Sequence, residues 1–280
     1  MDSQSKNTRF DHLVLADGQE AVATGRLVRV QQEGLGLVWW HQEPWPVDLL
    51  LPASAPVVVL FPRGPGREEE LIDRIGHRVL ATGMWSDGKL HVDTVTDITP
   101  AASPLRLPAQ SQDAPMHPVD EATRAVESPL FETGVVLWRF RRVAPGGVEE
   151  IVVSATDVTA ARRALLPVYG GRLRVYQSPW TADDLARLDA VIGAVEPTRR
   201  HAGGAGVSPE GIVYRRLLLT YLDQQLATTL SAFPEGMLKL EVQAQPRRRT
   251  ASDKVVEGRP CGPHRWAHSI DWDCRTDRCR

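Results

Sequence analysis

Cysteine is scarce in this chain and confined to one end. The three cysteines, Cys261, Cys274 and Cys279, lie within the last twenty residues, so disulfides cannot hold the rest of the fold together. No apolar run is long enough to cross a bilayer, and the first eighteen residues carry no apolar core of a secretory signal. These absences predict a soluble, cytoplasmic protein with no membrane partner.

Motifs that mark common enzymes are missing as well. The sequence has no GxxxxGK[ST], no GxGxxG after a strand, no GxSxG and no HExxH. The glycines of residues 203–206 are not followed by Lys or Ser/Thr in phosphate-loop spacing. We therefore expect no cofactor and favour a protein that is not an enzyme. A catalytic site assembled from distant residues would leave no motif, so an enzyme with a site between domains remains the weaker alternative.

The C-terminal segment is basic and rich in possible metal ligands. Residues 247–280 carry nine Lys and Arg against five Asp and Glu, whereas residues 20–100 carry seven against eleven. The possible zinc ligands are Cys261, His264, His268, Cys274 and Cys279. Their spacing matches no standard zinc module, and few apolar residues surround them. We predict no metal site and a disordered basic tail over residues 246–280, and the alternative is that these residues bind zinc and fold the tail as a small unit.

The clearest secondary-structure signal in the sequence predicts a hairpin over residues 76–98. Asp87-Gly88 lies between two alternating runs, and such a pair favours a two-residue type I′ turn. With that turn, Trp85 faces Leu90 and the register continues to a pair between Arg78 and Asp97. Opposite charges would meet at this last pair.

The region before the hairpin predicts more strands and one helix. Strand patterns cover residues 21–31 and 35–41, and two further runs, 47–51 and 57–61, compete for the third strand. A short helix is expected over 67–75. Three strands, a helix and two strands resemble the element order of an OB-type barrel. If both competing runs are strands, the barrel is embellished or is another small β-barrel or sheet.

The second half has a different pattern. Residues 101–128 are rich in Pro, Ala and Ser, which indicates a linker. Beyond it we expect an α+β domain with the order ββαβααβ, including a flexible loop over 196–207 and a long helix over 208–232. The predicted division is a loosely ordered N-terminus 1–19, an OB-like domain 20–100, the linker 101–128, the α+β domain 129–245 and the tail.

Two groups of residues are candidates for binding. Trp39, Trp40 and Trp85 lie on predicted strands of the first domain, where aromatics of an OB-type barrel stack on bases. Consecutive strand residues face opposite sides, so only one of Trp39 and Trp40 is expected to be exposed. The alternative is that these tryptophans serve packing.

The second group is basic. Arg139 and Arg141 share one strand face, and Arg172 and Arg174 share another. If those strands are neighbours, a basic surface forms that suits an anionic ligand or an acidic partner. The alternative is a solvated sheet face with scattered ion pairs.

The features together favour a non-catalytic two-domain binding or adaptor protein that acts through protein–protein contacts with an unknown protein partner. A single-stranded nucleic-acid-binding protein that uses the tryptophans and arginines is the alternative, although the acidic first domain weighs against it. Arg greatly outnumbers Lys in the chain, which suggests GC-rich coding DNA and a bacterial source.

Overall fold

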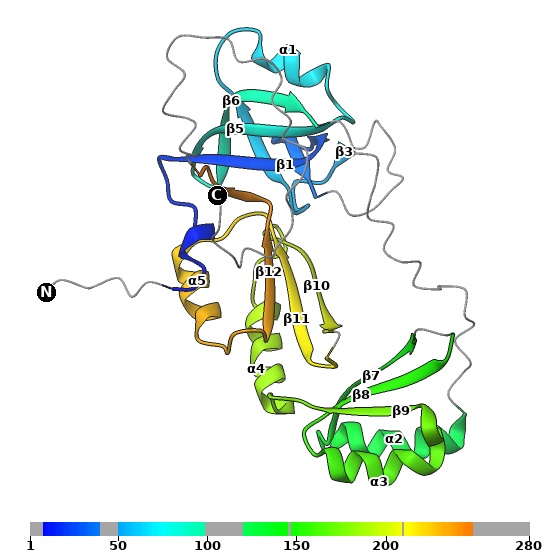
Figure 1. Cartoon of the computed structure of the whole chain (residues 1–280). Helices are drawn as coiled ribbons and strands as arrows, with labels where there is room; N and C mark the ends of the chain where they lie inside the picture. Colours follow the sequence, from blue (N-terminus) through cyan, green and yellow to red (C-terminus); the bar gives the residue numbers. More distant parts are fainter. Residues whose placement is uncertain (1–7, 40–49, 99–119, 145–146, 209, 249–280) are drawn as a thin grey trace, which may run out of the picture.

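Three sheets make up the described part of the chain (Figure 1). The computed structural model describes residues 8–39, 50–98, 120–144, 147–208 and 210–248. Trp40, the three cysteines and the predicted tail beyond residue 248 lie outside the described residues. Each sheet has its own buried apolar cluster and its own helices, so the expected α+β class is confirmed.

The first sheet closes on itself as a ring. Its strands are β1 (Gln19–Val30), β2 (Gly34–Val38), β4 (Val58–Pro62), β6 (Lys89–Asp97) and β5 (Arg78–Ser86). They pair in that order, and β5 pairs back onto β1. The helix α1 (Arg67–Ile72) lies between β4 and β5 in the chain. Every ring pair is antiparallel except β4 with β6. The ring encloses a core that includes Leu27, Leu37 and Leu90.

The structure decides between the two runs that competed for the third strand. β4, at residues 58–62, is the ring strand between β2 and β6. The other run contributes only β3 (Leu50–Leu51), which pairs parallel with β1 outside the ring. A second addition to β1 comes from the far end of the chain, where β13 (Ala244–Pro246) pairs antiparallel with it.

The hairpin turn is confirmed, but its register changes partway along. Asp87 and Gly88 both have positive φ, 53° and 73°, as a type I′ turn requires. Trp85 pairs with Leu90 as predicted, but a bulge at Asp93 shifts the later pairs by one residue. Asp97 therefore pairs with Val79, and the predicted pair with Arg78 is wrong. The bulge turns Val95 inward, because the apolar side chains at 90, 92 and 95 cannot share one face of a regular strand.

The chain then forms a unit with the order αββαβ, which we call the first unit. Its elements are α2 (Glu121–Glu132), β7 (Val136–Val143), β8 (Glu149–Ala155), α3 (Val158–Tyr169) and β9 (Leu173–Gln177), with a short 3-10 turn η2 (Gly170–Arg172) before β9. β8 lies in the middle, antiparallel to β7 and parallel to β9. Both helices lie on one face (Figure 1). Residues 121–128 of the predicted linker are thus helical, with Asp120 as the N-cap.

A second unit repeats this order and pairing. Its elements are α4 (Ala182–Gly193), β10 (Arg200–Val207), β11 (Val213–Leu219), α5 (Gln224–Ser231) and β12 (Leu238–Val242). β11 lies in the middle, antiparallel to β10 and parallel to β12. The predicted order ββαβααβ lacks α2, β10 and β11, so the duplication of the αββαβ order was not predicted.

Two expectations about the second unit are wrong. The predicted loop over 196–207 contains β10, and the predicted helix over 208–232 is the strand β11 followed by the short helix α5. Val213, Leu217 and Leu219 are fully buried on one strand face. The four-residue spacing of leucines that predicted a helix runs across two elements, β11 and α5: Leu218, Leu222, Leu226 and Leu230. Asp223 ends the strand region and caps α5 by accepting from Leu226 N.

The start of the chain packs onto the second unit. Phe10 and Leu13, around the 3-10 turn η1 (Asp11–Leu13), belong to that unit's core. Leu15 N donates to Leu222 O at 2.9 Å, and the Leu15 side chain reaches the core of the ring. Residues 8–15 are therefore packed, contrary to the expectation of a loosely ordered N-terminus there.

Candidate functional site: a groove beside strand β10

A groove lies between the two αββαβ units. Its volume is about 650 Å³. The first unit contributes Trp138 of β7, and the second contributes the C-terminal end of α4, strand β10 and Arg215 of β11. Trp138 is 36% exposed, which is high for so large an apolar side chain. The groove therefore has one aromatic wall and one wall formed largely by a strand.

Strand β10 lies at the edge of its sheet, with β11 on one side. Ser208 N donates to Ile212 O at 2.9 Å, and this bond identifies which residue pairs of β10 and β11 are hydrogen-bonded pairs. Because bonded and non-bonded pairs alternate along antiparallel strands, the backbone groups facing β11 are those of residues 202, 204 and 206. Gly203 and Ala205 lie between them in the register, so their N–H and C=O groups point outward from the sheet.

Charged groups in the groove are mostly satisfied by each other. Arg215 donates from Nε and Nη2 to the two carboxylate oxygens of Asp189, both at 2.6 Å. Arg200 donates from Nη1 to Ile192 O at 2.9 Å and has no carboxylate partner among the described residues. Arg200 is thus the cation of the groove that remains available to an acidic ligand.

The N-terminal end of β10 is joined to the ring through a buried amide. Gln243 is 4% exposed, and its Nε2 donates to Thr24 O and Leu37 O, both at 3.0 Å. Its Oε1 lies 2.8 Å from His201 Nε2. Since Gln243 uses its amide nitrogen for the carbonyls, its oxygen accepts from His201. The His201 ring also lies beside that of Trp39, with ring centroids 5.6 Å apart.

The two predicted tryptophans that the structure describes, Trp39 and Trp85, lie in different environments. Trp39 lies beside His201 at the junction of the ring with the second unit. Trp85 is 2% exposed and packs against Tyr221, with centroids 5.1 Å apart. The expectation that Trp85 offers a binding surface is wrong, because its side chain points into the core of the ring.

The predicted basic surface is also neutralised. β7 and β9 are not neighbours, because β8 lies between them and supplies Glu149 and Glu150. Glu149 pairs with Arg141 at 3.2 Å and with Arg172 at 3.5 Å. The condition for a basic surface, that the two arginine strands are neighbours, is therefore not met, because β8 places a glutamate between the arginines on each side of it.

Glu150 forms the second of these bridges. It pairs with Arg142 at 2.8 Å and with Arg174 at 2.9 Å. The hydrogen bond from Arg142 is the main cause that lowers the pKa of Glu150, with Arg174 adding to it. The described contacts agree with the alternative of a sheet face with ion pairs.

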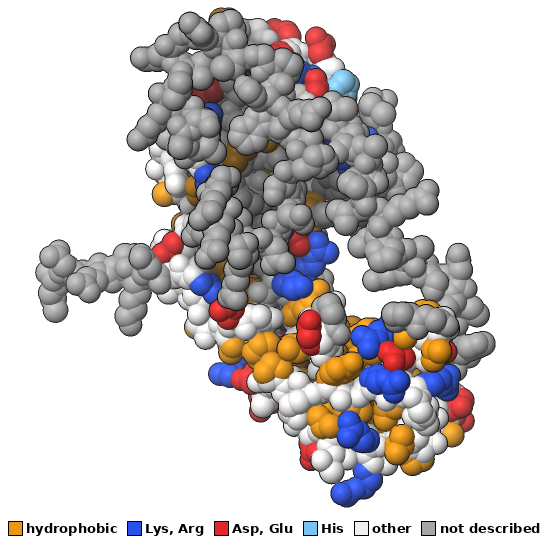
Figure 2. Space-filling view, viewed as in Figure 1, with side chains coloured by type: hydrophobic (Ala, Val, Ile, Leu, Met, Phe, Trp, Pro, Cys, Tyr) orange, Lys and Arg blue, Asp and Glu red, His pale blue; other side chains and the backbone are white. Residues whose placement is uncertain are grey.

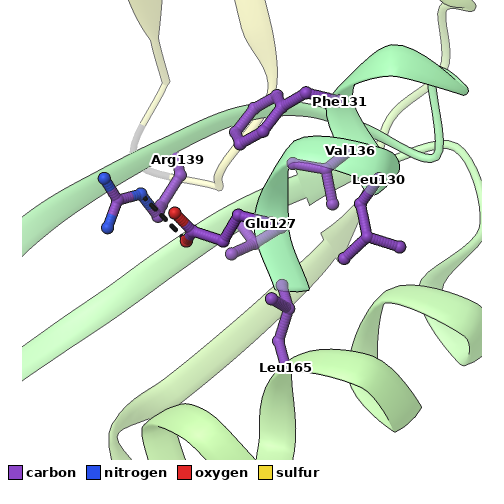
Figure 3. Close-up of a pocket in the computed structure, with 7 residues that line it drawn as sticks. Glu127, Leu130, Phe131, Val136, Arg139 and Leu165 are labelled. Carbon is purple, nitrogen blue, oxygen red and sulfur yellow. Dashed lines mark ion pairs between the residues drawn. The ribbon is translucent and has the colours of Figure 1, made fainter. Parts of the chain in front are cut away.

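Arg139, the remaining predicted arginine, belongs to a buried cluster under α2 (Figure 3). Its Nε lies 3.2 Å from Glu127 Oε1 and its Nη1 donates to Tyr169 Oη at 3.0 Å. Tyr169 in turn donates to Glu127. Burial, with the nearby Glu127, raises the pKa of Tyr169 to about 12. The small pocket at this cluster has no room for a water molecule, and Arg139 is engaged there by Glu127 and Tyr169.

The ring carries a further surface cluster that the sequence analysis did not select. Phe61 is 40% exposed. Its ring centroid is 5.6 Å from that of His91 and 4.9 Å from Lys89 Nζ. Pairing of β4 with β6 brings these residues together, and nothing in the uniformly apolar run 57–61 distinguishes Phe61 as the exposed residue.

Comparison with known proteins adds no relative: no protein-family model, no curated protein and no solved structure matches this chain. The described residues contain no group of three or more side chains suited to hold a metal ion. The C-terminal Cys and His residues lie outside this description. No helix in the described ranges is long and apolar enough to cross a membrane.

Proposed function

We propose that the chain is a non-catalytic binding protein that holds a polypeptide partner in the groove between the two αββαβ units. The observation that carries this proposal is the groove itself, where an edge strand faces an exposed tryptophan across about 650 Å³. Edge strands and exposed aromatics are common anchors of protein–protein contacts. The groove's acid, Asp189, is bound to Arg215, an arrangement that favours binding over proton transfer.

Exposed apolar side chains of the first unit support the proposal. Of the eight large exposed hydrophobic residues in the described ranges, five belong to this unit: Phe131, Trp138, Val143, Val148 and Leu166. Figure 2 shows hydrophobic side chains interleaved with Lys and Arg over this part of the molecule. Such a mixture of apolar and arginine side chains is typical of protein interfaces.

We also infer that the ring is an OB-type barrel and that the chain acts as an adaptor with two separate binding bodies. The support is the strand order, in which the first ring strand pairs with the second and the fourth, and the third pairs with the fifth. The helix α1 lies between the third and fourth ring strands, as in the OB fold.

Photo-crosslinking tests the proposed partner binding. A benzophenone amino acid at Gly204, which is exposed with open space around its Cα, should crosslink to a partner protein in cells that produce the chain. The matched control is the same label at Gly171, which is also exposed and unobstructed but outside the groove. Crosslinks should disappear with Trp138→Ala. Equal crosslinking from both positions, or none from Gly204, would contradict the proposal.

Single-stranded nucleic acid is the second candidate ligand, at the ring. Exposed Phe61 lies beside the half-buried side chains of His91 and Lys89, the latter also paired with Glu33 at 2.9 Å, and aromatic side chains beside cations stack on bases. Anisotropy of a labelled oligo(dT) should then show binding that weakens with salt and with Phe61→Ala. Leu50→Ala, at another exposed apolar position on β3, is the control. If Phe61→Ala leaves binding unchanged, nucleic-acid binding at this cluster is ruled out.

A further inference from the structure

We propose that the polypeptide partner binds as an added β-strand along the outer edge of β10, as an extended segment with an apolar residue for Trp138 and a carboxylate for Arg200. This inference rests on the proposed function and specifies how the partner is recognised. Strand addition uses backbone hydrogen bonds for affinity and side-chain pockets for specificity. The groove supplies both kinds of contact.

The backbone of β10 is set up for this mode of binding. Gly203 and Ala205 direct their N–H and C=O groups outward, since residues 202, 204 and 206 are the ones bonded to β11. No described strand pairs with that outer edge. Soluble proteins usually protect an edge with charge, proline or a covering element. The segment from 202 to 206 has neither charge nor proline, no described strand covers it, and it lines the groove.

Glycine at this edge lets a second backbone approach closely. Gly204 is exposed, and an added Cβ there would meet nothing within 4 Å. Glycine normally weakens a strand because it adds no packing, so two adjacent glycines in a sheet edge need a compensating reason. Close approach of a partner strand supplies that reason.

The walls of the groove define the chemistry of the partner. Trp138 offers an exposed aromatic side chain to an apolar residue. Arg200 keeps donors beyond its bond to Ile192 O and has no carboxylate partner among the described residues. Arg215 and Asp189 neutralise each other, which leaves the groove with one excess positive charge. An extended segment that combines an apolar and an acidic residue complements this charge and shape.

The probe for a test is a phage-displayed library of random dodecapeptides selected on the full-length chain, followed by synthesis of the selected sequences. We expect apolar residues and Asp or Glu to be enriched and internal proline to be depleted. Gly203→Pro should weaken peptide binding about tenfold or more, because it removes an outward N–H and places a ring at the edge. Proline is tolerated there, since the lost N–H faces outward.

Gly203→Ala is the matched control. It keeps the N–H, and its Cβ would lie 3.5 Å from the Ile192 side chain, an ordinary contact, so binding should stay within about twofold. A second measurement does not depend on variants of the protein: N-methylation along the peptide should weaken binding at every second residue, because only alternate backbone groups face β10.

The outcomes separate the two claims. Suppose that peptide binding is lost with Trp138→Ala or Arg200→Gln but is unchanged by Gly203→Pro and shows no alternation on N-methylation. This result would overturn strand addition and leave the proposed groove function in place. If no selected peptide depends on Trp138 or Arg200, the proposed function falls together with the inference. Loss of binding with Gly203→Ala as large as with Gly203→Pro would also overturn strand addition, because a steric effect would then explain both.

Discussion

Replacement of Gln243 by leucine tests the connection between the ring and the second unit. The Gln243 side chain makes three hydrogen bonds, two donated to Thr24 O and Leu37 O and one accepted from His201. Leucine fills a similar volume but makes none of them. Each bond contributes about 0.5–1.5 kcal/mol net, and a buried group left without a partner costs about 1–3 kcal/mol. We therefore expect Gln243→Leu to destabilise the junction by about 2–4 kcal/mol.

The assay must resolve local stability, because the chain contains separate buried clusters and its unfolding need not be a single two-state transition. Native-state hydrogen exchange meets this need. We expect loss of protection around Gly25 and Val38 of the ring and around residues 200–203, with the first unit unchanged. The Gly25 Cα lies so close to this junction that an added Cβ would be 2.6 Å from Val38 O and 2.7 Å from Gln243 Nε2.

Two further variants sharpen the result. Gln245→Leu is the control, since Gln245 donates only a local bond to Val242 O and should cost less than about 1 kcal/mol. Gln243→Glu should cost at least as much as Gln243→Leu, because an ionised carboxylate would face two carbonyl oxygens without a proton to donate. The reasoning is refuted if Gln243→Leu changes local stability by less than about 0.5 kcal/mol, or if it matches Gln245→Leu.

Three other predictions concern single positions. Gly83→Ala should cost about 2 kcal/mol or more, because its Cβ would lie 1.9 Å from His91 O; urea unfolding beside Gly171→Ala, where the Cβ meets nothing within 4 Å, checks this. Gly88→Val should cost about 1–3 kcal/mol, since φ is 73° there; unchanged melting would disprove the turn. The pKa of Tyr169 is raised from 10 to about 12, so this group's stabilisation is complete below pH 10 and is lost as pH rises toward 12. Between pH 9 and 11 the wild type should lose about 1 kcal/mol more than Tyr169→Phe, and equal losses would contradict the assignment.

The candidate site was less predictable from sequence than the fold. Residues 200–207 contain one Gly/Ala run, 202–206, and few large apolar residues, a pattern typical of loops. Only pairing with the buried strand β11 makes them a strand. Trp138 is next to Arg139 in the sequence, but its place across from β10 depends on how the two units pack. No local sequence pattern predicts that contact. The groove is formed by residues far apart in the sequence, so no motif marks it.

Local interactions are what the sequence determined by itself. Positive φ at Asp87-Gly88 fixed the turn, the Thr181–Asp184 capping box fixed the start of α4, and Asp157 fixed the start of α3. Each depends on neighbours within four residues. Such features can be predicted from sequence because they do not depend on the position of any distant part of the chain.

Tertiary structure decided the features that depend on burial. The bulge at Asp93 exists because Val95 must reach the core of the ring, and β11 is a strand because β10 and β12 flank it. β8 separates the arginine strands because the αββαβ order places it between β7 and β9. Register and neighbour choice are set by apolar area buried against distant elements, and this burial outweighs a local pattern such as the leucine spacing across β11 and α5.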